Sequence, residues 1–466
     1  MKRRQFLAAS AMAAAGYGAG FSFATKPARA QSKPRLQIPP LLDTQTTGRL
    51  SLTAKTGSLK VFDGPATPTT GFNQGYLGPT VIMKNGEVEA RVDNELNEPV
   101  SVHWHGLMVP GEQDGGPHQP VASGNSWKPD LNIAQPPTTA WYHTHIHERT
   151  AAQVYSGLAG VIHVSDGRDD ERGLPANYGV DDLTLVLQDR RITGSGAMLY
   201  EPSMMDVMHG FLGNWMLVNG QAGTVAAVPK GVVRLRLLNG SNARAYLLAF
   251  DDGRPMHLVA TDSGYLSAPV ALQSINLSPG ERIEILVDFS DGAAPVLISG
   301  ATQPFAVQEF ATDAALPVRI TRVPDVLDGE LEDLSGREMR TRQVSLDMGM
   351  GGMMMGGARF GINGRAFDMD RIDFEVALGS VERWVVTSTM LPHPFHVHGV
   401  RFQVVSENGN TPRPENRGWK DTVYVPGEAE IIARFDQPAP RDKPFMFHCH
   451  ILEHEDAGMM GQFTVT

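Results

Sequence analysis

The chain repeats one pattern of strands three times, at roughly the length of a domain. Similar segments begin near Leu77, Leu217 and Phe360, and each combines a glycine-bearing turn, a valine-rich strand and a second strand. A further matching strand follows in each unit, as SWKPDLNIAQ, GERIEILVDFS and GEAEIIARFDQ. The alternation of apolar and polar residues indicates half-buried antiparallel strands. Because solenoid repeats are much shorter, the pattern predicts an all-β chain of three similar β-sandwich domains without a long helix.

The domain limits follow from the spacing of the repeats and from changes in composition. The acidic stretch PDVLDGELEDLSGRE indicates a connector before the last repeat. The first and third repeats carry histidine clusters, whereas the second reads AYLLAFDDGRPMHLV at the matching place. This asymmetry predicts metal bound by the two ends of the chain, with the middle domain as a scaffold without metal ligands. The expected divisions are residues 31–166 for domain 1, 167–323 for domain 2, 324–338 for the connector and 339–466 for domain 3.

Residues 1–30 are typical of an export signal. The basic start contains the pair Arg3 and Arg4, an alanine-rich apolar stretch follows, and Ala28-Arg29-Ala30 matches a cleavage site. The paired arginines resemble a twin-arginine signal, so we expect a periplasmic protein exported by that route. The alternative is an N-terminal membrane anchor, but the apolar run is short and rich in alanine and glycine. No stable membrane insertion is expected elsewhere in the sequence.

Histidines gather in four short motifs that hold ten of the fifteen histidines of the chain. Alternate side chains of a strand share a face, so each His-x-His pair directs two imidazoles the same way. One such pair is usually a pair of surface histidines, but four pairs in one chain indicate metal binding. The members are His103 and His105; His143 and His145; His393, His396 and His398; and His448, His450 and His454.

The only cysteine, Cys449, lies between two of these histidines. In a strand, His448 and His450 point to one face and Cys449 to the other, which would join two metal sites on the order of 10 Å apart. A thiolate with two imidazoles and a weak thioether is the ligand set of a blue-copper electron-transfer site, whereas structural zinc prefers more thiolates. The other interpretation of Cys449 is a buried free thiol packed as a small apolar side chain. The partners expected for Cys449 are His393, His454 and Met459.

The four motifs, in this order, resemble those of three-domain multicopper oxidases, the class of laccases, spore-coat oxidases and bacterial cuprous oxidases. The resemblance covers essentially the whole mature chain and implies three consecutive cupredoxin-like Greek-key β-sandwich domains. It also implies four copper ions: one type 1 ion in domain 3, and one type 2 and two type 3 ions in a trinuclear cluster between domains 1 and 3. The implied ligands are His393, Cys449, His454 and Met459 for type 1; His103 and His396 for type 2; and His105, His143, His145, His398, His448 and His450 for type 3.

The reduction of dioxygen to water that the resemblance implies consumes protons, which nearby acids would supply. Asp114 matches a family carboxylate near the type 2 copper, and Glu455 matches one on the route to the type 3 pair. The other interpretations are a solvated loop acid for both and, for Glu455, a charge on a strand face. His147, one alternate step beyond His145, is expected beside the ligands or in a solvent channel.

A methionine-rich stretch, LDMGMGGMMMGGARF, bears on the electron donor. Thioethers are soft ligands that favour Cu(I), and the cuprous oxidases that the chain resembles carry a longer methionine-rich insert in this region. The other interpretation is a flexible loop whose methionines pack on the surface. The candidate Cu(I) contacts are Met348, Met350, Met353, Met354 and Met355, together with Met390.

The segment before His393 departs from the cuprous-oxidase pattern. Those enzymes tend to have a carboxylate a few residues before the first type 1 histidine, where this chain reads STMLP. Met390 can still contribute a ligand, and Asp347 or Asp368 could replace the missing acid. This departure leaves the Cu(I) route of the family open for this chain.

Three functions fit these features. The favoured one is a cuprous oxidase that detoxifies Cu(I), coupling one-electron oxidation at the type 1 copper to four-electron reduction of dioxygen to water. The second is laccase-like oxidation of phenols or aromatic amines through an open edge at His454. The third is a non-catalytic copper-binding or cell-envelope interaction protein. A copper nitrite reductase is set aside because it lacks the type 3 pair. The net charge of −11 argues against a nucleic-acid partner, and we expect a monomer.

Deletion of residues 348–357 tests whether the methionine-rich stretch binds the donor. We expect oxygen uptake driven by Cu(I) to fall, because the soft ligands are lost, and phenol oxidation to stay equal or rise. Equal loss of both activities would contradict a role in Cu(I) binding.

Overall fold

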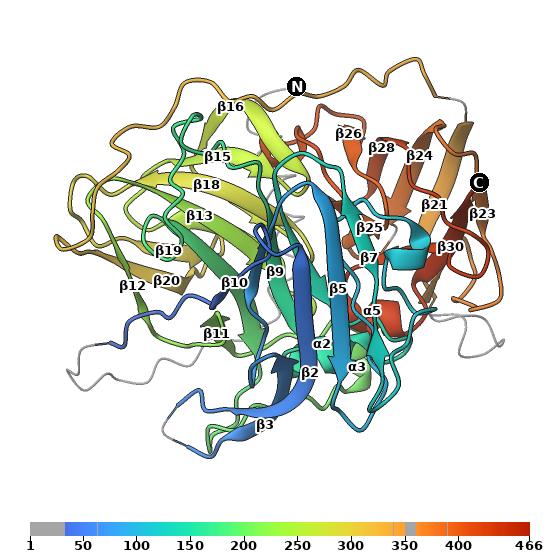
Figure 1. Ribbon diagram of the computed structural model, residues 1–466, viewed down its shortest axis with the longest axis horizontal. Helices are drawn as coiled ribbons and strands as arrows, with labels where there is room; N and C mark the ends of the chain where they lie inside the picture. Colours follow the sequence, from blue (N-terminus) through green and yellow to red (C-terminus); the bar gives the residue numbers. More distant parts are fainter. Residues whose placement is uncertain (1–32, 63, 339, 350–359, 389) are drawn as a thin grey trace.

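The computed structural model describes residues 33–62, 64–338, 340–349, 360–388 and 390–466. Six sheets form three consecutive β-sandwiches, which confirms the all-β prediction. In Figure 1 the blue strands of domain 1 lie between the green and yellow strands of domain 2 and the orange and red strands of domain 3. The expected signal sequence, residues 1–30, lies outside the described residues.

Domain 1 consists of two facing sheets around a core of aliphatic and aromatic side chains. The first sheet has the order β1 (Leu41–Asp43), β4 (Thr80–Met83), β9 (Ala159–Val164) and β8 (Thr138–His143). The second has the order β3 (Thr67–Phe72), β2 (Arg49–Leu59), β5 (Gly86–Asn94) and β6 (Ser126–Trp127), with β7 (Asp130–Ile133) also paired to β5.

Domain 2 is the largest sandwich by strand number and has its own apolar core. Its first sheet runs β11 (Trp215–Val218), β10 (Asp182–Arg190), β13 (Val232–Asn239), β18 (Arg282–Asp288), β15 (Met256–Thr261) and β16 (Gly264–Leu272). Its second sheet runs β12 (Val225–Val228), β20 (Phe305–Thr312), β19 (Val296–Ser299), β14 (Tyr246–Phe250) and β17 (Ile275–Leu277).

Domain 3 repeats the arrangement and contains Cys449 in its core. Its first sheet runs β22 (Phe360–Ile362), β21 (Arg340–Met348), β24 (Val381–Ser388), β28 (Glu428–Arg434) and β26 (Phe402–Glu407). Its second sheet runs β23 (Phe374–Val376), β30 (Met460–Val465), β29 (Phe445–Cys449), β25 (His393–Val397) and β27 (Thr422–Val425).

The strand pairing supports the threefold repeat and corrects one detail of the prediction. The three segments expected as matching strands form β6 and β7, β18, and β28, and each pairs antiparallel with the valine-rich strand of its unit. The valine-rich strand also pairs in parallel with an earlier strand, in β2–β5, β10–β13 and β21–β24. The sheets are therefore mixed rather than purely antiparallel. In addition, β13 is buried along its whole length, not half-buried, because domain 1 covers its outer face.

The helices in the described part of the chain are short. They are α2 (Thr150–Ser156), α3 (Met204–His209), α5 (Leu452–Asp456) and the 3-10 turns η1 (Gly111–Gln113) and η2 (Pro414–Asn416). None of the described helices is long and apolar enough to cross a membrane.

The three α-helices come from the three domains and pack together beside domain 3 (Figure 1). The carboxylate of Asp456 on α5 accepts hydrogen bonds of 2.9 Å from the backbone N–H groups of Thr150 and Ala151, at the start of α2. A carboxylate at this position satisfies free N–H groups and complements the helix dipole. The contact therefore joins domain 1 to domain 3 next to the histidine motifs.

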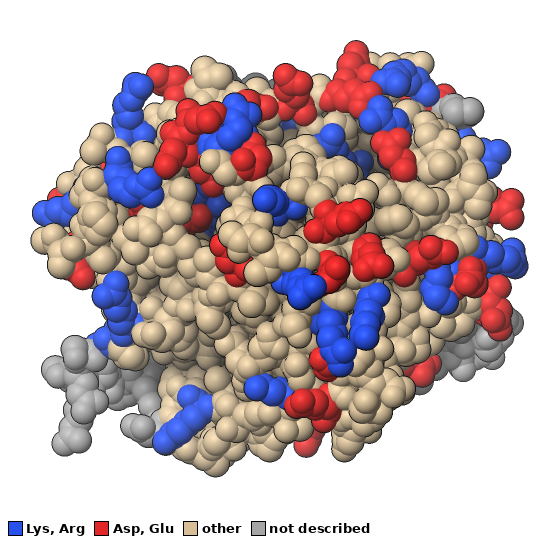
Figure 2. All heavy atoms as spheres, in the orientation of Figure 1, with Lys and Arg blue, Asp and Glu red and all other residues tan. Residues whose placement is uncertain are grey.

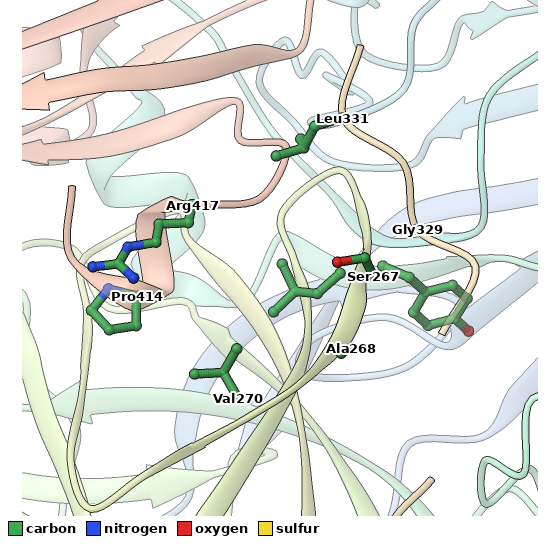
Figure 3. A pocket seen from close by; sticks show the side chains of 9 residues that line it. Ser267, Ala268, Val270, Gly329, Leu331, Pro414 and Arg417 are labelled. Atoms are coloured by element: carbon green, nitrogen blue, oxygen red, sulfur yellow. The ribbon is translucent and has the colours of Figure 1, made fainter. Parts of the chain in front are cut away.

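The acidic connector, residues 324–338, packs on both neighbouring domains. Leu327 donates its backbone N–H to Ser267 of β16 at 2.9 Å, and the Trp419 indole donates to the carbonyl of Glu330 at 2.8 Å. Leu334 is buried against domain 3. A cavity of about 220 Å³ remains between the connector, β16 and the segment around Arg417 (Figure 3). It contains none of the expected copper ligands.

Charged side chains of both signs are mixed over the face shown in Figure 2. Other charges are buried between the first two domains. Arg236 on β13 bonds Asp182 at 2.8 Å and Glu284 at 3.0 Å, and Arg234 also bonds Glu284. Thr139 of domain 1 donates its hydroxyl to Glu284 at 2.6 Å. Burial alone would raise the pKa of Glu284, but the two guanidiniums hold it below its usual value. The ion pairs lie within domain 2, and the hydrogen bonds of Glu284 and Arg236 with Thr139 join them to domain 1.

The substitution Glu284→Gln tests this buried network. It leaves two buried guanidiniums short of a counter-charge, so we expect the free energy of unfolding to fall by about 3 kcal/mol or more. Denaturant titration followed by tryptophan fluorescence measures the change. The exposed pair Arg49–Glu89 offers a matched control, since Glu89→Gln removes an ion pair worth about 1 kcal/mol or less. Equal midpoints for the two variants would contradict the stabilising role of the network.

Candidate metal centres

The histidine motifs lie where strands of domains 1 and 3 meet. The backbone of His103 forms an isolated antiparallel bridge with that of His143 in domain 1. In domain 3, His396 on β25 lies directly opposite His448 on β29. The other members sit at alternate positions or just beyond the strand ends, as the His-x-His spacing predicts. The structure thereby gathers eight histidines into one buried cluster: His103, His105, His143, His145, His396, His398, His448 and His450.

The ring nitrogens of this cluster face one another at short distances. Nε2 of His103 lies 3.4 Å from Nε2 of His396. Nε2 of His448 lies 3.3 Å from that of His145 and 3.2 Å from that of His398. In several groups of three residues the ligand atoms all lie within 4.8 Å of one another. One such group is His145, His398 and His448. Such spacing suits imidazoles that share a metal ion.

Burial favours the neutral form of most histidines in the cluster. Burial, followed by repulsion from neighbouring imidazoles, lowers the pKa of His143, His145 and His398 well below its usual value. Nε2 of His143 and both ring nitrogens of His450 have no hydrogen-bond partner within the described residues. A buried polar atom without a partner costs free energy, and neutral imidazole is a ligand for copper and related metals. The residues of the cluster therefore fit copper.

The second candidate centre surrounds the single cysteine. Sγ of Cys449 lies 3.3 Å from Nδ1 of His393 and 3.8 Å from Nδ1 of His454, and the two nitrogens are 3.2 Å apart. Met459 is fully buried, and its carbonyl accepts the backbone N–H of Cys449 at 3.1 Å. Burial raises the pKa of the Cys449 thiol well above its usual value. A bound cation would deprotonate it, which fits a blue-copper donor set.

The edge of His454 is covered rather than open. Its Nε2 lies 3.3 Å from the carbonyl oxygen of Met208 on α3, and the residue has no exposed surface. Phe360 stacks on its ring at a centroid distance of 4.8 Å. The open edge expected for direct contact with a phenol is therefore not observed. A segment of domain 2 separates this histidine from solvent.

Asp114 lies among the ligands, at the end of η1. Its Oδ2 is 2.7 Å from Nδ1 of His398 and 3.4 Å from Nδ1 of His103, and its carbonyl lies 3.0 Å from that same His103 nitrogen. The residue is buried, unlike a solvated loop acid. An acceptor on Nδ1 orients each ring and leaves Nε2 for a metal.

Glu455 also contacts the cluster, but it lies on α5 and not on a strand face. Its carboxyl oxygens are 3.4 Å from Nδ1 of His145 and 3.2 Å from Nδ1 of His448. Burial and the neighbouring Asp456 and Glu453 raise the pKa of Glu455 well above its usual value. The side chain can therefore hold a proton next to two ring nitrogens.

Sequence reasoning missed three positioning residues, Asp421 of domain 3 and Arg282 and Gly280 of domain 2. Asp421 lies 3.1 Å from Nε2 of His105, and its carbonyl lies 2.8 Å from Nδ1 of His396. Arg282 on β18 holds this carboxylate with bonds of 2.7 and 2.5 Å. Gly280, at φ +84°, approaches His450 so closely that a Cβ would lie 2.7 Å from its ring. No local spacing marks these residues, because they belong to different domains.

The proposed Cu(I) contacts have different surroundings. Met348 ends β21 and packs in the core of domain 3, so a deletion that tests the methionine stretch should begin at Met350. Met390 is 50% exposed. The possible substitute Asp347 accepts the Gly364 N–H at 2.6 Å within a turn, and Asp368 is exposed. Four contacts lie outside the described residues: Met350, Met353, Met354 and Met355.

His147 lies at the edge of the domain 1–domain 3 contact. Its side chain is 30% exposed, and its ring packs edge-on against Phe367 at a centroid distance of 5.0 Å. Among the described residues, His147 belongs to none of the groups whose ligand atoms lie within 4.8 Å of one another.

Comparisons with known families agree with this geometry. Family models described as multicopper oxidase match residues 53–169, 139–296 and 338–466. The chain therefore belongs to the multicopper oxidase family, and its three sandwiches are cupredoxin-like, as predicted.

Individual relatives carry different names. Cell division protein FtsP of Sodalis glossinidius is 39% identical over 485 residues, covering 100% of this chain and 98% of the relative. The protein of the same name in Escherichia coli is 38% identical, with coverage of 100% and 99%. The solved laccase-like multi-copper oxidase CueO of Ochrobactrum sp. is 44% identical with a TM-score of 0.89, covering 92% of this chain and 100% of that one. A Campylobacter jejuni multicopper oxidase, called a metallo-oxidase, is 27% identical with a TM-score of 0.80, with coverage of 93% and 96%.

The substitution Arg282→Met tests the support that domain 2 gives to the histidine cluster. It leaves the carboxylate of Asp421 buried without its guanidinium, so we expect the copper affinity of the cluster to fall about 10- to 100-fold. The blue absorption that depends on Cys449 should stay unchanged. Metal analysis after dialysis against a chelator measures the loss, with the exposed Arg49→Met as control. Full copper retention in the Arg282 variant would contradict this role.

Proposed function

We propose that this chain is a periplasmic copper oxidase that couples one-electron oxidation of a donor, favoured as Cu(I), to reduction of dioxygen to water. The observation that carries the proposal is the position of His448, Cys449 and His450 at the end of β29. Cys449 lies in the histidine–thiolate set, while its two neighbours lie in the cluster of eight histidines. One short stretch of backbone thereby connects an electron-transfer site to an oxygen-reducing site.

The assignment of copper ligands rests on the donor sets. Type 1 copper would be held by Cys449, the two histidines near it and Met459, and three further ions by the eight clustered histidines. Copper supplies one-electron redox chemistry at the first site and dioxygen reduction at the second. The chain's own side chains orient the imidazoles and exclude water, since all the proposed ligands are buried.

Two carboxyl groups contact the clustered histidines and are assigned different roles. Glu455 lies against His145 and His448 on the side of the cluster nearer α5. Asp114 lies against His398 and His103. We propose that Glu455 delivers protons toward the proposed type 3 ligands and that Asp114 orients the imidazoles of the proposed type 2 side.

The covered edge of His454 favours a small ionic donor over a phenol. A phenol must bring its ring close to the accepting histidine, but the Met208 carbonyl and Phe360 occupy the surroundings of that ring. A Cu(I) ion can instead bind to soft side chains at the surface and transfer its electron over a short distance. The relatives include both a metallo-oxidase and a laccase-like enzyme with activity towards lignin model compounds.

A second candidate is a role in the cell envelope during division. Its support is the name of the FtsP relatives, which match the whole chain at 38–39% identity. On that proposal the protein interacts with envelope components and its copper sites serve stability. The retention of all twelve proposed copper ligands argues for oxidase activity in addition or instead.

Oxygen consumption by the purified, copper-loaded protein separates these proposals. Cu(I) and a simple phenol are compared side by side, with and without added Cu(II). We expect strong uptake with Cu(I), and phenol-dependent uptake only when Cu(II) is supplied. Strong phenol turnover without added copper would identify a laccase, and no uptake with either donor would favour the cell-envelope role.

A further inference from the structure

The short helix α3 presents soft metal ligands at the surface of domain 2. Its sequence is MMDVMH, and Met204 and Met205 are 56% and 63% exposed. His209 is also exposed. Large apolar side chains with so much exposed surface are few among the described residues, and two of them are adjacent here.

The helical spacing places these ligands in pairs. Residues four apart lie on the same side of a helix, so Met205 faces His209, and Met204 faces Met208. Nδ1 of His209 lies 3.1 Å from the carbonyl oxygen of Met205. Since a carbonyl only accepts, Nδ1 donates in this contact, which leaves Nε2 as the ligand nitrogen of the neutral ring. Met205 and His209 therefore offer a thioether and an imidazole nitrogen on the same side of the helix.

The helix is held in place and is not a loose surface turn. Ser203 and Asp206 form a reciprocal capping box at its start. The carboxylate of Asp206 also binds Arg191 at 2.7 Å. Fixed backbone geometry reduces the conformational entropy that ligand binding would otherwise cost.

The same helix contacts a ligand of the cysteine-centred site. The Met208 carbonyl lies 3.3 Å from Nε2 of His454, and the Met208 side chain packs against the core that contains Cys449. Met208 is the direct neighbour of His209 in sequence. The backbone between Met208 and His209, together with the Met208–His454 hydrogen bond, therefore connects the pair Met205 and His209 to His454.

We propose that Met205 and His209, assisted by Met204, form a Cu(I)-binding site from which electrons enter the protein through the Met208–His454 hydrogen bond. Two thioethers and one imidazole suit Cu(I), which prefers soft ligands. The proposal rests on the proposed oxidase function and names the place where its metal substrate binds. Each bound Cu(I) loses one electron and leaves as Cu(II). Four electrons and four protons convert one dioxygen into two waters.

Silver titration tests the site without turnover, because Ag(I) has the soft-ligand preference of Cu(I) and is not oxidised. The copper-loaded full-length protein is titrated with Ag(I) by calorimetry and compared with the triple variant Met204→Leu, Met205→Leu, His209→Gln. We expect the variant to bind one Ag(I) fewer per chain, and Met205→Leu alone to weaken binding about tenfold or more. Met369→Leu, a half-buried methionine outside α3, is the control and should match the wild type. Equal stoichiometry and affinity in the triple variant would overturn the proposal.

Kinetics provide a second, independent readout. The triple variant should raise the KM for Cu(I) by about tenfold or more while the blue absorption and the phenol activity in the presence of Cu(II) remain unchanged. An unchanged KM for Cu(I) would overturn the electron-entry role. Absence of oxygen uptake by the wild type with every donor would refute the oxidase function, and the silver titration would still decide whether α3 binds a soft cation.

Discussion

The burial of ten imidazole rings in two groups, eight in the cluster and two beside Cys449, dominates the organisation of this structure. Burial lowers the pKa of most of them, which favours the neutral imidazole with one unprotonated ring nitrogen. Unprotonated nitrogens without hydrogen-bond partners are costly in a protein interior. A metal cation between the rings would remove that cost, and the proposed ligands of the cluster come from both domain 1 and domain 3.

Each domain has a distinct part in this arrangement. Domains 1 and 3 supply the proposed ligands at the ends of their strands, where the side chains can converge across the contact between two sandwiches. Domain 2 supplies none of them. It instead provides Arg282, which holds Asp421 against His105, and the backbone of Gly280, which lies against His450. It also places α3 over His454. The middle domain thereby contacts both candidate metal centres.

The sequence was sufficient for the features that follow from local periodicity. Two-residue spacing in a strand determines which histidines share a face, so the positions of His103, His105, His448 and His450 could be predicted with the all-β fold. Long-range partners could not be predicted in this way. Asp421, Arg282 and Gly280 have no distinctive neighbours in sequence, and only the docking of the domains brings them to the cluster. Glu455 was expected near the ligands, but the helix that carries it was not, because five residues are too few to show helical periodicity.

The parallel pairing of β2 with β5, β10 with β13 and β21 with β24 could not be predicted from local sequence either. Alternation of apolar and polar residues reports burial of a strand face, but the direction of the neighbouring strand depends on connections far along the chain. The covered edge of His454 also arises between domains, from α3 and Phe360.

Copper content shows directly whether the clustered histidines and Cys449 hold metal. The full-length protein, purified and exposed to excess copper and then to a chelator, can be quantified by elemental analysis, with X-ray absorption used to detect sulfur coordination. We expect four retained copper ions per chain, one of them bound to the sulfur of Cys449. Retention of fewer than one copper ion per chain, or the absence of a copper–sulfur bond, would contradict this expectation.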